Sequence, residues 1–413
     1  MQHVETVIIG AGQTGLATSY WLQQAGREHL VLDQAAMPAS AWRTGRWDSF
    51  TLVTPNWTVN MPGAQYDIPD RDGFMPLPGI IDYFDRYVEL HQPPVQYNSR
   101  VDAVRPFDGG GYQLDAGGGQ IRAENVVIAT GFEQLPGIPA TAGGISPEIL
   151  QIHSSQYRNP EALPPGAVMV VGSAQSGAQI AEELNHRGRE VYLSVSGAGR
   201  ARRRYRGKDG FEWLWQIGFF DLPPEKFPGD ATRFVPPHLT GIDGGHTLNL
   251  HQFARDGVHL LGHVREAAGT TVRLAPDLYE SLAKGDGFEK SMTQMIDGYI
   301  QVAGIDAPPE ETQDLRDGFE QPLRESLDLR ESGIGSIVWA TGYRHDDSMI
   351  ELPVTDERGF LIGDRGISQY PGLYFAGMIW MPGIKPVTLG GVSESARHIV
   401  DAIVARQRTP VIA

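Results

Sequence analysis

The sequence predicts an α/β fold in which one chain builds two dinucleotide-binding, Rossmann-like domains, the second inserted into the first. Two observations predict it. A short apolar strand runs through a glycine-rich turn into a helix twice, at residues 4–26 and 168–184. Each unit is followed far downstream by an apolar strand that ends in Ala-Thr-Gly, at 125–131 and 336–342. Because a further apolar strand (372–377) and a final helix follow, we expect the C-terminal segment to complete the first domain.

The remaining elements follow from hydrophobic periodicity and from turn-forming residues. Two glycine triplets, at 109–111 and 117–119, punctuate an expected β-meander, and the Pro/Gly-rich stretch 134–166 is typical of a linker. Expected helices cover 13–25, 79–91, 211–219, 247–256, 277–303 and 391–406, and expected strands cover 4–9, 28–32, 95–105 and 190–195. We therefore divide the 413 residues into a first domain, 1–155 and 334–413, and an inserted domain, 156–333.

The first glycine turn, in GAGQTG, carries Gly10, Gly12 and Gly15. Glycine at these positions permits a tight turn, the close approach of a pyrophosphate and close packing of the helix on the strand. The helix N-terminus adds unpaired N–H groups and a partial positive charge. Asp33 stands 23 residues after Gly10, at the end of the next expected strand, where its carboxylate can accept hydrogen bonds from ribose hydroxyls. The unit therefore predicts a dinucleotide site.

The second turn, in GSAQSG, carries Gly172, Ala174 and Gly177, so a methyl group stands near the expected pyrophosphate path. No acid follows the next expected strand at the position that corresponds to Asp33. The segment SVSGAGRARRRYRGK comes there instead, and its hydroxyls and arginines suit a 2′-phosphate, which favours NADPH over NADH. The alternative is a solvated basic loop on an acidic protein.

Two nucleotide sites imply two redox partners. A nicotinamide delivers a hydride, and a tightly held FAD accepts it and passes the electrons on. Disulfide reductases share the plan of two glycine turns, but they need a redox-active cysteine pair, and this chain contains no cysteine. The lack of cysteine also excludes a disulfide, a thiolate nucleophile and a cysteine-rich metal site. The acceptor of the electrons is left open at this point.

Charge and hydropathy limit the partners. The chain has 34 basic and 50 acidic side chains, and the formal charge of −16 argues against nucleic acid or an anionic membrane as the general partner. There is no uninterrupted apolar run of transmembrane length. The first expected strand begins at about Val4, which leaves no room for a signal peptide. We therefore expect a soluble, cytoplasmic protein.

With these motifs in place, the chain resembles the class B flavin-dependent monooxygenases: flavin-containing, N-hydroxylating and Baeyer–Villiger types, and the auxin-biosynthetic enzymes of plants. The resemblance covers nearly the whole chain, is strongest to uncharacterised bacterial members, and rests on GAGQTG, GSAQSG, WATGY and HSSQY (153–157). HSSQY matches the His-x-x-x-aromatic half of the family signature. Pro147 and Ile149 stand where the family has Phe and Gly, which weakens a Baeyer–Villiger assignment.

The resemblance implies that NADPH reduces FAD and that O₂ adds at the flavin C4a position. The resulting (hydro)peroxyflavin would oxygenate a small nitrogen- or sulfur-containing metabolite, with no metal. The implied partners are this metabolite and O₂, without nucleic acid or a membrane span, and a homodimer is compatible with this reading. Two alternatives stay open. One is a flavin dehydrogenase or oxidase that reduces a quinone or O₂ without oxygenating a substrate, and the other is a non-catalytic redox-sensing subunit.

The resemblance also selects TPNWTVNM, in which Asn56 precedes Met61 by five residues, a spacing found in flavin-containing monooxygenases near the flavin and nicotinamide. Asn56 is the candidate catalytic residue, and the alternative is a turn former after Pro55. We favour a hinge role for His153 over direct catalysis, and packing for the aromatic segment 210–228 over a substrate wall. The residues expected to bind the two cofactors are Gly10, Gly12, Gln13, Thr14, Gly15, Asp33, Gln34, Trp42, Arg43, Trp47, Val101, Thr130, Gly131, Gly172, Ser173, Gln175, Ser176, Gly177, Ser194, Arg200, Arg203, Thr341, Gly342 and Gly377.

Overall fold

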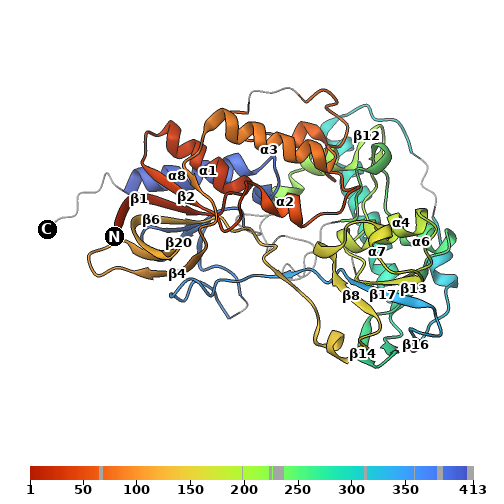
Figure 1. Cartoon of the computed structure of the whole chain (residues 1–413). Coiled ribbons are helices and arrows are strands. Elements are labelled where there is room, and N and C mark those ends of the chain that lie inside the picture. Colours follow the sequence, from red (N-terminus) through yellow and green to blue (C-terminus); the bar gives the residue numbers. More distant parts are fainter. Residues whose placement is uncertain are drawn as a thin grey trace.

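The computed structural model describes residues 1–64, 68–197, 199–222, 226, 237–310, 314–357, 359–378 and 385–406. Two sheets with parallel cores lie in separate halves of the molecule, each with its own helices (Figure 1). The chain passes from the first half to the second and returns, so β1 (Gln2–Ile9) and α8 (Val392–Arg406) both belong to the first half. The predicted α/β fold, with one Rossmann-like domain inserted into the other, is confirmed.

The first sheet is built around β1, which runs parallel to β2 and β6. Val7 packs toward the β-meander and Ile8 packs toward α8, so both faces of this central strand are buried. The strand order is β19 (Gly363–Asp364), β20 (Ile367–Ser368), β21 (Leu373–Phe375), β6 (Gly119–Ile128), β1, β2 (His29–Leu32) and β3 (Val95–Gln96), with β4 (Val101–Pro106) and β5 (Tyr112–Ala116) completing the meander. Its helices are α1 (Gln13–Gln24), α2 (Ser40–Thr44), α3 (Leu77–His91) and α8, with 3-10 turns η1 (Asn56–Thr58) and η10 (Lys385–Val387).

The C-terminal segment completes this first half. β21 runs parallel to β6, and α8 packs along α1. Ile399 and Ile403 of α8 are fully buried, since the helix places one apolar stripe against the sheet.

The second sheet consists of parallel strands, and its inner strands at 167–171 and 191–194 are buried on both faces. The order is β13 (His259–Leu261), β10 (Val191–Ser194), β9 (Ala167–Val171), β17 (Ile334–Trp339) and β8 (Leu150–His153). Its main helices are α4 (Gln175–His186), α5 (Gly210–Gln216), α6 (Leu250–Arg255) and α7 (Leu278–Ala303). A three-stranded antiparallel sheet joins β14 (Val264–Ala268), β15 (Thr271–Leu274) and β16 (Ser326–Asp328). Short elements are β11 (Arg204–Tyr205), β12 (Lys208–Asp209), η2 (Ala140–Gly144), η3 (Ser154–Gln156), η4 (Pro160–Ala162), η5 (Phe219–Asp221), η8 (Ile242–Gly244) and η9 (Asp317–Glu320).

The second sheet extends beyond the expected inserted domain, 156–333, at both ends. β8 and β17 lie beside one another in this sheet, and both fall outside that range. The four residues of β8 lie within the Pro/Gly-rich stretch 134–166, which the sequence predicted to be a linker. β17 pairs with β9, which is far from it in sequence. The chain leaves the first half through one segment and returns through another, and we call these the two crossing segments. They meet in a short antiparallel ladder, β7 (Leu135–Pro136) with β18 (Tyr343–Arg344).

Candidate active site

The first glycine turn joins the end of β1 to the start of α1. Gly10 has a φ of +110°, and a β-carbon there would stand 2.5 Å from the carbonyl oxygen of Ala129. A β-carbon on Gly15 would overlap the carbonyl oxygen of Gly10. Both positions therefore require glycine. Gly12 differs, because a β-carbon there would meet no described protein atom within 4 Å.

This open space at Gly12 lies at the N-terminus of α1. Gly12 is the N-cap residue, and its helix end carries no side-chain cap. Unpaired N–H groups and the partial positive charge of the helix end favour an anion, and the lack of a side chain at Gly12 lets one approach. The residues present at this turn therefore fit the pyrophosphate of FAD.

The second turn repeats the arrangement between β9 and α4. Gly172 has a φ of +100°, and a β-carbon there would stand 2.5 Å from the carbonyl oxygen of Ala340. Gly177 packs on the Gly172 carbonyl, just as Gly15 packs on Gly10. Ala174 is the N-cap of α4, again without a side-chain cap. The turn thus fits the pyrophosphate of NADPH, and each Ala-Thr-Gly segment packs on the glycine turn of its own domain.

Asp33 lies at the end of β2, beside the first turn. Its two carboxylate oxygens accept hydrogen bonds from the N–H groups of Ala11 (2.6 Å) and Ala35 (2.7 Å). A carboxylate has about four acceptor sites, so Asp33 keeps capacity for ribose hydroxyls while its backbone partners fix its orientation.

Several other residues expected at the flavin site meet at the start of α1. The side-chain amide of Gln13 donates to the carbonyl oxygen of Val387 (2.8 Å). A β-carbon on Gly377 would overlap the side chain of Thr14, so the segment after β21 packs tightly on α1. The turn at 129–131 packs on Gly10 in the same region.

The remaining expected flavin residues are Gln34, Trp42, Arg43, Trp47 and Val101, and they are more dispersed. Arg43 forms an ion pair with Asp85 of α3. Trp47 is buried, and its ring packs edge-on against Phe50 with centroids 5.1 Å apart. Gln34 is exposed, and Val101 is buried at the start of β4.

The residues expected to bind the nicotinamide cofactor gather around the second turn, where Ser176 follows Gln175 in the first turn of α4. The Ser173 hydroxyl accepts a hydrogen bond from the N–H of Ser196 (2.9 Å), which ties this turn to the end of β10. The amide of Gln175 makes two hydrogen bonds with the backbone of Leu239, one of them 3.1 Å long. A segment distant in sequence therefore covers the start of α4.

The structure gives Arg200 and Arg203 other partners than the expected phosphate. Arg200 pairs with Asp286 (3.0 Å) and with Glu289, both on α7. Arg203 is 1% exposed and pairs with Asp209 (2.9 Å). Their role in phosphate binding stays a prediction, and it would require Arg200 to share its charge with two carboxylates.

Sequence reasoning missed a lysine near the end of β10. A β-carbon on Gly197 would stand 3.5 Å from Cδ of Lys284, which comes from α7. The Lys284 ammonium is exposed and pairs with Glu280 (2.8 Å). No local pattern could reveal this cation, because the packing of α7 alone brings it beside the second nucleotide turn.

Asn56 begins η1, in a loop next to the first nucleotide domain's core. Its backbone N–H donates to the carbonyl oxygen of Gly73 (2.9 Å), and its side-chain Nδ2 donates to that of Asp70 (2.7 Å). Its Oδ1 is buried and has no hydrogen-bond partner among the described residues. A buried acceptor without a partner costs about 1–3 kcal/mol. This amide oxygen is held in place by the hydrogen bond of its own Nδ2, and it is available to a donor that the described residues do not supply.

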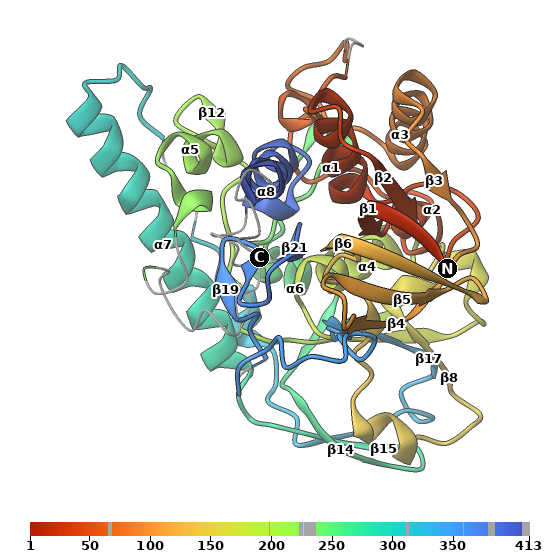
Figure 2. The ribbon, with the colours of Figure 1, turned by 90° about the vertical axis from the view of Figure 1, so that its left-hand side faces the viewer.

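The aromatic segment forms a wall beside this loop. Trp57, the neighbour of Asn56, packs on Phe211 and Trp215 with ring centroids 6.2 and 5.7 Å apart. The Lys385 ammonium lies 5.2 Å from the Trp215 ring, and α5 stands between α7 and the start of α8 (Figure 2). The aromatic cluster thus joins the inserted domain to two segments of the first domain. Residues 223–225 and 227–228 of the expected segment lie outside the described residues.

His153 lies where the two crossing segments meet. Its buried ring bonds through Nε2 to the carbonyl oxygen of Gly342 (2.9 Å) and through Nδ1 to Ser155 (2.9 Å), and it packs edge-on against Tyr343. Burial lowers the pKa of His153, so the ring is neutral at neutral pH. Thr341 donates to the carbonyl oxygen of Gly137 (2.8 Å) in the same place. These contacts fix His153 at the junction between the two halves, and its role as a hinge stays a prediction.

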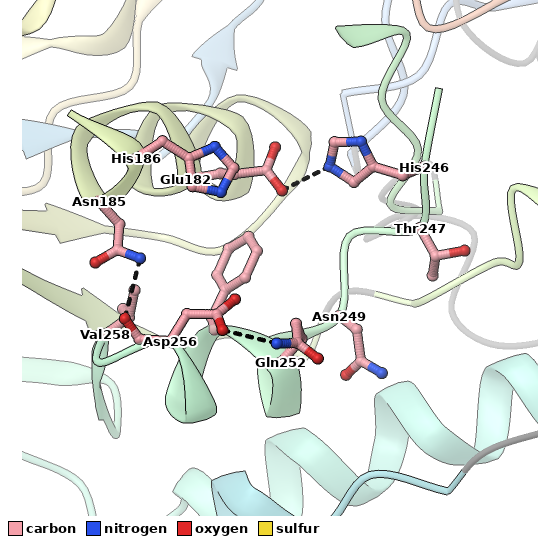
Figure 3. A pocket seen from close by; sticks show the side chains of 10 residues that line it. Glu182, Asn185, His186, His246, Thr247, Asn249, Gln252, Asp256 and Val258 are labelled. Carbon is pink, nitrogen blue, oxygen red and sulfur yellow. Dashed lines mark hydrogen bonds and ion pairs between the residues drawn. The ribbon is translucent and has the colours of Figure 1, made fainter. Parts of the chain in front are cut away.

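A polar cavity of about 220 Å³ lies between α4 and α6, along the C-terminal half of α4 (Figure 3). In it His246 bonds to the buried carboxylate of Glu182 (2.7 Å). Among the described residues, no group of three or more His, Asp or Glu side chains is arranged to hold a metal ion. Within that same part of the chain, every helix is too short or too polar to cross a membrane.

The chain is similar to several known oxidoreductases and monooxygenases. Residues 7–209 match the family described as pyridine nucleotide-disulphide oxidoreductase. The chain is 29% identical, over 98% of its length and 99% of the other, to an uncharacterized CzcO-like oxidoreductase of Geobacillus kaustophilus. It is 29% identical to the indole-3-pyruvate monooxygenase YUCCA4 of Oryza sativa subsp. japonica over 44% of this chain and 45% of that one. Its fold matches a flavin-containing monooxygenase from Stenotrophomonas maltophilia with a TM-score of 0.67, at 22% identity, over 98% of this chain and all of that chain.

The chain is thus similar over nearly its whole length to an oxidoreductase, and it has the fold of a flavin-containing monooxygenase. The two glycine turns fit the pyrophosphates of FAD and NADPH, one each. The matching family is named for disulfide reduction, but this chain has no cysteine with which to carry it out. Monooxygenase chemistry does not need one, because the flavin carries the reacting groups.

Proposed function

We propose that this chain is a class B flavin-dependent monooxygenase that oxygenates a small nitrogen- or sulfur-containing metabolite. The observation that carries the proposal is Oδ1 of Asn56, a buried amide oxygen without a partner among the described residues. It stands on a loop of the FAD-binding half that contacts the aromatic wall of the NADPH-binding half. An acceptor at this boundary supports a site where both cofactors are held.

The chain's own groups bind the cofactors, orient them and exclude water from the site. The N-termini of α1 and α4 would hold the two pyrophosphates, and Asp33 would accept hydrogen bonds from a ribose. When bound, NADPH supplies a hydride to FAD, and reduced FAD activates O₂. Asn56 Oδ1 would accept a hydrogen bond from a bound cofactor, while Nδ2 keeps its hydrogen bond to the Asp70 carbonyl oxygen.

Exclusion of water favours oxygenation over the release of peroxide, because it protects reactive species from hydrolysis and proton leakage. The buried cluster around Phe211, Leu214 and Phe219 packs against Trp57 of η1 and Val387 of η10, two segments of the first half. This cluster brings apolar surface to the Asn56 loop. It therefore supports an oxygenase over an oxidase that releases peroxide.

The test is to measure NADPH consumption, hydrogen peroxide and oxygenated product together, with panels of amines, thioethers and ketones. We expect a yellow protein with about one FAD per chain, and an amine or thioether that raises product while lowering peroxide per NADPH. If every electron pair appears in peroxide or in an added quinone, the protein is an oxidase or dehydrogenase. If neither nicotinamide reduces the flavin, the redox-sensing alternative holds.

A further inference from the structure

Arg203 reaches across the boundary between the two halves of the molecule. It belongs to the inserted half and is 1% exposed. Its Nε donates to Asp209 (2.9 Å), and its Nη1 donates to the carbonyl oxygen of Val53 in the first half (2.6 Å). Its guanidinium carbon lies 4.0 Å from the ring centroid of Phe74, also in the first half. One side chain therefore contacts the first half at two points.

Both contacts are made to the backbone segments that hold Asn56 in place. Val53 stands three residues before Asn56 on the same loop. Phe74 follows Gly73, whose carbonyl oxygen accepts the Asn56 N–H. The two backbone segments are joined to one another between Thr51 and Pro76. The guanidinium therefore holds both sides of the loop pair 51–57 and 70–76 that carries Asn56.

Arg203 is also held in place within its own half of the molecule. Asp209, which accepts from Arg203, is the N-cap of α5 and accepts from the N–H of Phe211 (2.8 Å). The Arg203 N–H in turn donates to the Thr247 hydroxyl (2.9 Å). Arg203 thus ties the Asn56 loop to the helix that carries the aromatic wall.

The chemistry of the side chain suits this task. A guanidinium is flat, stays charged, and donates in fixed directions while its face stacks on an aromatic ring. A lysine ammonium cannot make the two directed bonds and the stacked contact at once. Arg204 serves as a natural comparison, because it pairs with the same Asp209 (2.8 Å) but is 53% exposed.

We propose that Arg203 is a positioning residue, which holds the Asn56 loop from the inserted half and thereby keeps the Asn56 amide oxygen directed into the site. The inference rests on the proposed function in so far as Asn56 acts there. It assigns to Arg203 a role other than phosphate binding, and the contacts of its Nε, its Nη1 and its ring face carry that assignment.

The experiment compares Arg203→Lys and Arg203→Met with Arg204→Met in the FAD-loaded full chain. Hydrogen exchange of the amides of residues 51–57 is measured by mass spectrometry, without turnover. Loss of a charge-assisted hydrogen bond should speed local opening about tenfold or more. We expect this acceleration in both Arg203 variants and exchange as in the wild type in Arg204→Met. Because the lysine variant keeps the charge, its acceleration would show that charge alone does not hold the loop.

A second measurement reports on the site. In the Arg203 variants, the rate of flavin reduction by NADPH and the affinity for NADP⁺ should change less than about twofold, while peroxide released per NADPH rises. Should Arg203→Met fail to fold, Phe74→Leu removes the stacked contact from the other side of the boundary and should speed exchange in 51–57 as well. Wild-type exchange in the Arg203 or Phe74 variants, an equal acceleration in Arg204→Met, or a selective loss of NADP⁺ affinity would overturn the proposal. Exchange is measured without turnover, so these outcomes are independent of whether the protein oxygenates a substrate.

Discussion

Gly10 packs directly on Ala129, so that a β-carbon on the glycine would stand 2.5 Å from the alanine's carbonyl oxygen. The same relationship joins Gly172 to Ala340 in the other half. Each contact holds a nucleotide-binding turn against the end of a strand that arrives more than a hundred residues later. The glycine turn and the Ala-Thr-Gly turn are therefore one structural unit in each domain.

Gly12→Val should separate cofactor binding from folding. A β-carbon at this position meets no described protein atom within 4 Å, and the φ of −79° suits any residue. We expect a folded protein that has lost its FAD, because the new side chain occupies the path of the pyrophosphate. Visible absorbance and the FAD-to-protein ratio measure this loss.

Gly10→Ala is the matched comparison for Gly12→Val. It should lower the free energy of unfolding of the apoprotein by at least about 2 kcal/mol, since φ is +110° and the carbonyl of Ala129 is in the way. A Gly12→Val protein that keeps one FAD per chain would contradict the assignment of this turn.

Asn56→Leu should raise peroxide release per NADPH while leaving FAD bound and flavin reduction largely intact. The substitution removes the unpartnered Oδ1 and leaves the Asp70 carbonyl without its donor, at a stability cost of about 1 kcal/mol. Stopped-flow reduction and a peroxide assay measure the two steps. Asn60→Leu is the control, because Asn60 is exposed four residues away. Equal peroxide release in the two variants would make Asn56 a turn former.

NADPH should reduce the flavin more efficiently than NADH, and Lys284→Ala should weaken NADP⁺ binding about tenfold without affecting NAD⁺. One charge-assisted phosphate contact contributes roughly 1.5–3 kcal/mol. Lys290→Ala, an exposed lysine on the same helix, is the control. Arg200→Ala should chiefly lower stability, because Asp286 and Glu289 lose a shared cation. A selective loss of NADP⁺ affinity in Arg200→Ala would instead support the prediction made from the sequence. Equal use of both nicotinamides would remove the argument for a phosphate site.

The Glu182–His246 pair should make stability depend on pH. The hydrogen bond to Glu182 raises the pKa of His246 above its usual value. A histidine with a raised folded-state pKa contributes stability that is fully present below the unfolded value of about 6.5 and is lost as pH rises through the folded value. We expect denaturant unfolding to show this loss as the pH rises above about 6.5 in the wild type, and much less of it in Glu182→Gln. The same slope in both proteins would exclude the pair as its source.

Local patterns were enough to predict much of the fold and both nucleotide turns. The strand, glycine turn and helix of each unit lie within about two dozen residues, and each is specified by hydrophobic periodicity and by backbone positions that need glycine. The resemblance that selected Asn56 also depends on a short local spacing. These features can be predicted from the sequence because residues close together in the chain determine them.

The tertiary structure decided what depends on distant partners. Sequence alone showed a run of arginines, but α7 brings Asp286 and Glu289 to Arg200, and the folded boundary brings Val53 and Phe74 to Arg203. Whether an arginine binds a phosphate or braces a loop depends on which groups surround it after folding. Three further features also depend on distant partners: the strand β8 in the expected linker, the approach of Lys284 to Gly197, and the unpartnered oxygen of Asn56. Each is determined by packing between segments that are far apart in the chain, so the side-chain pattern within one segment cannot predict it.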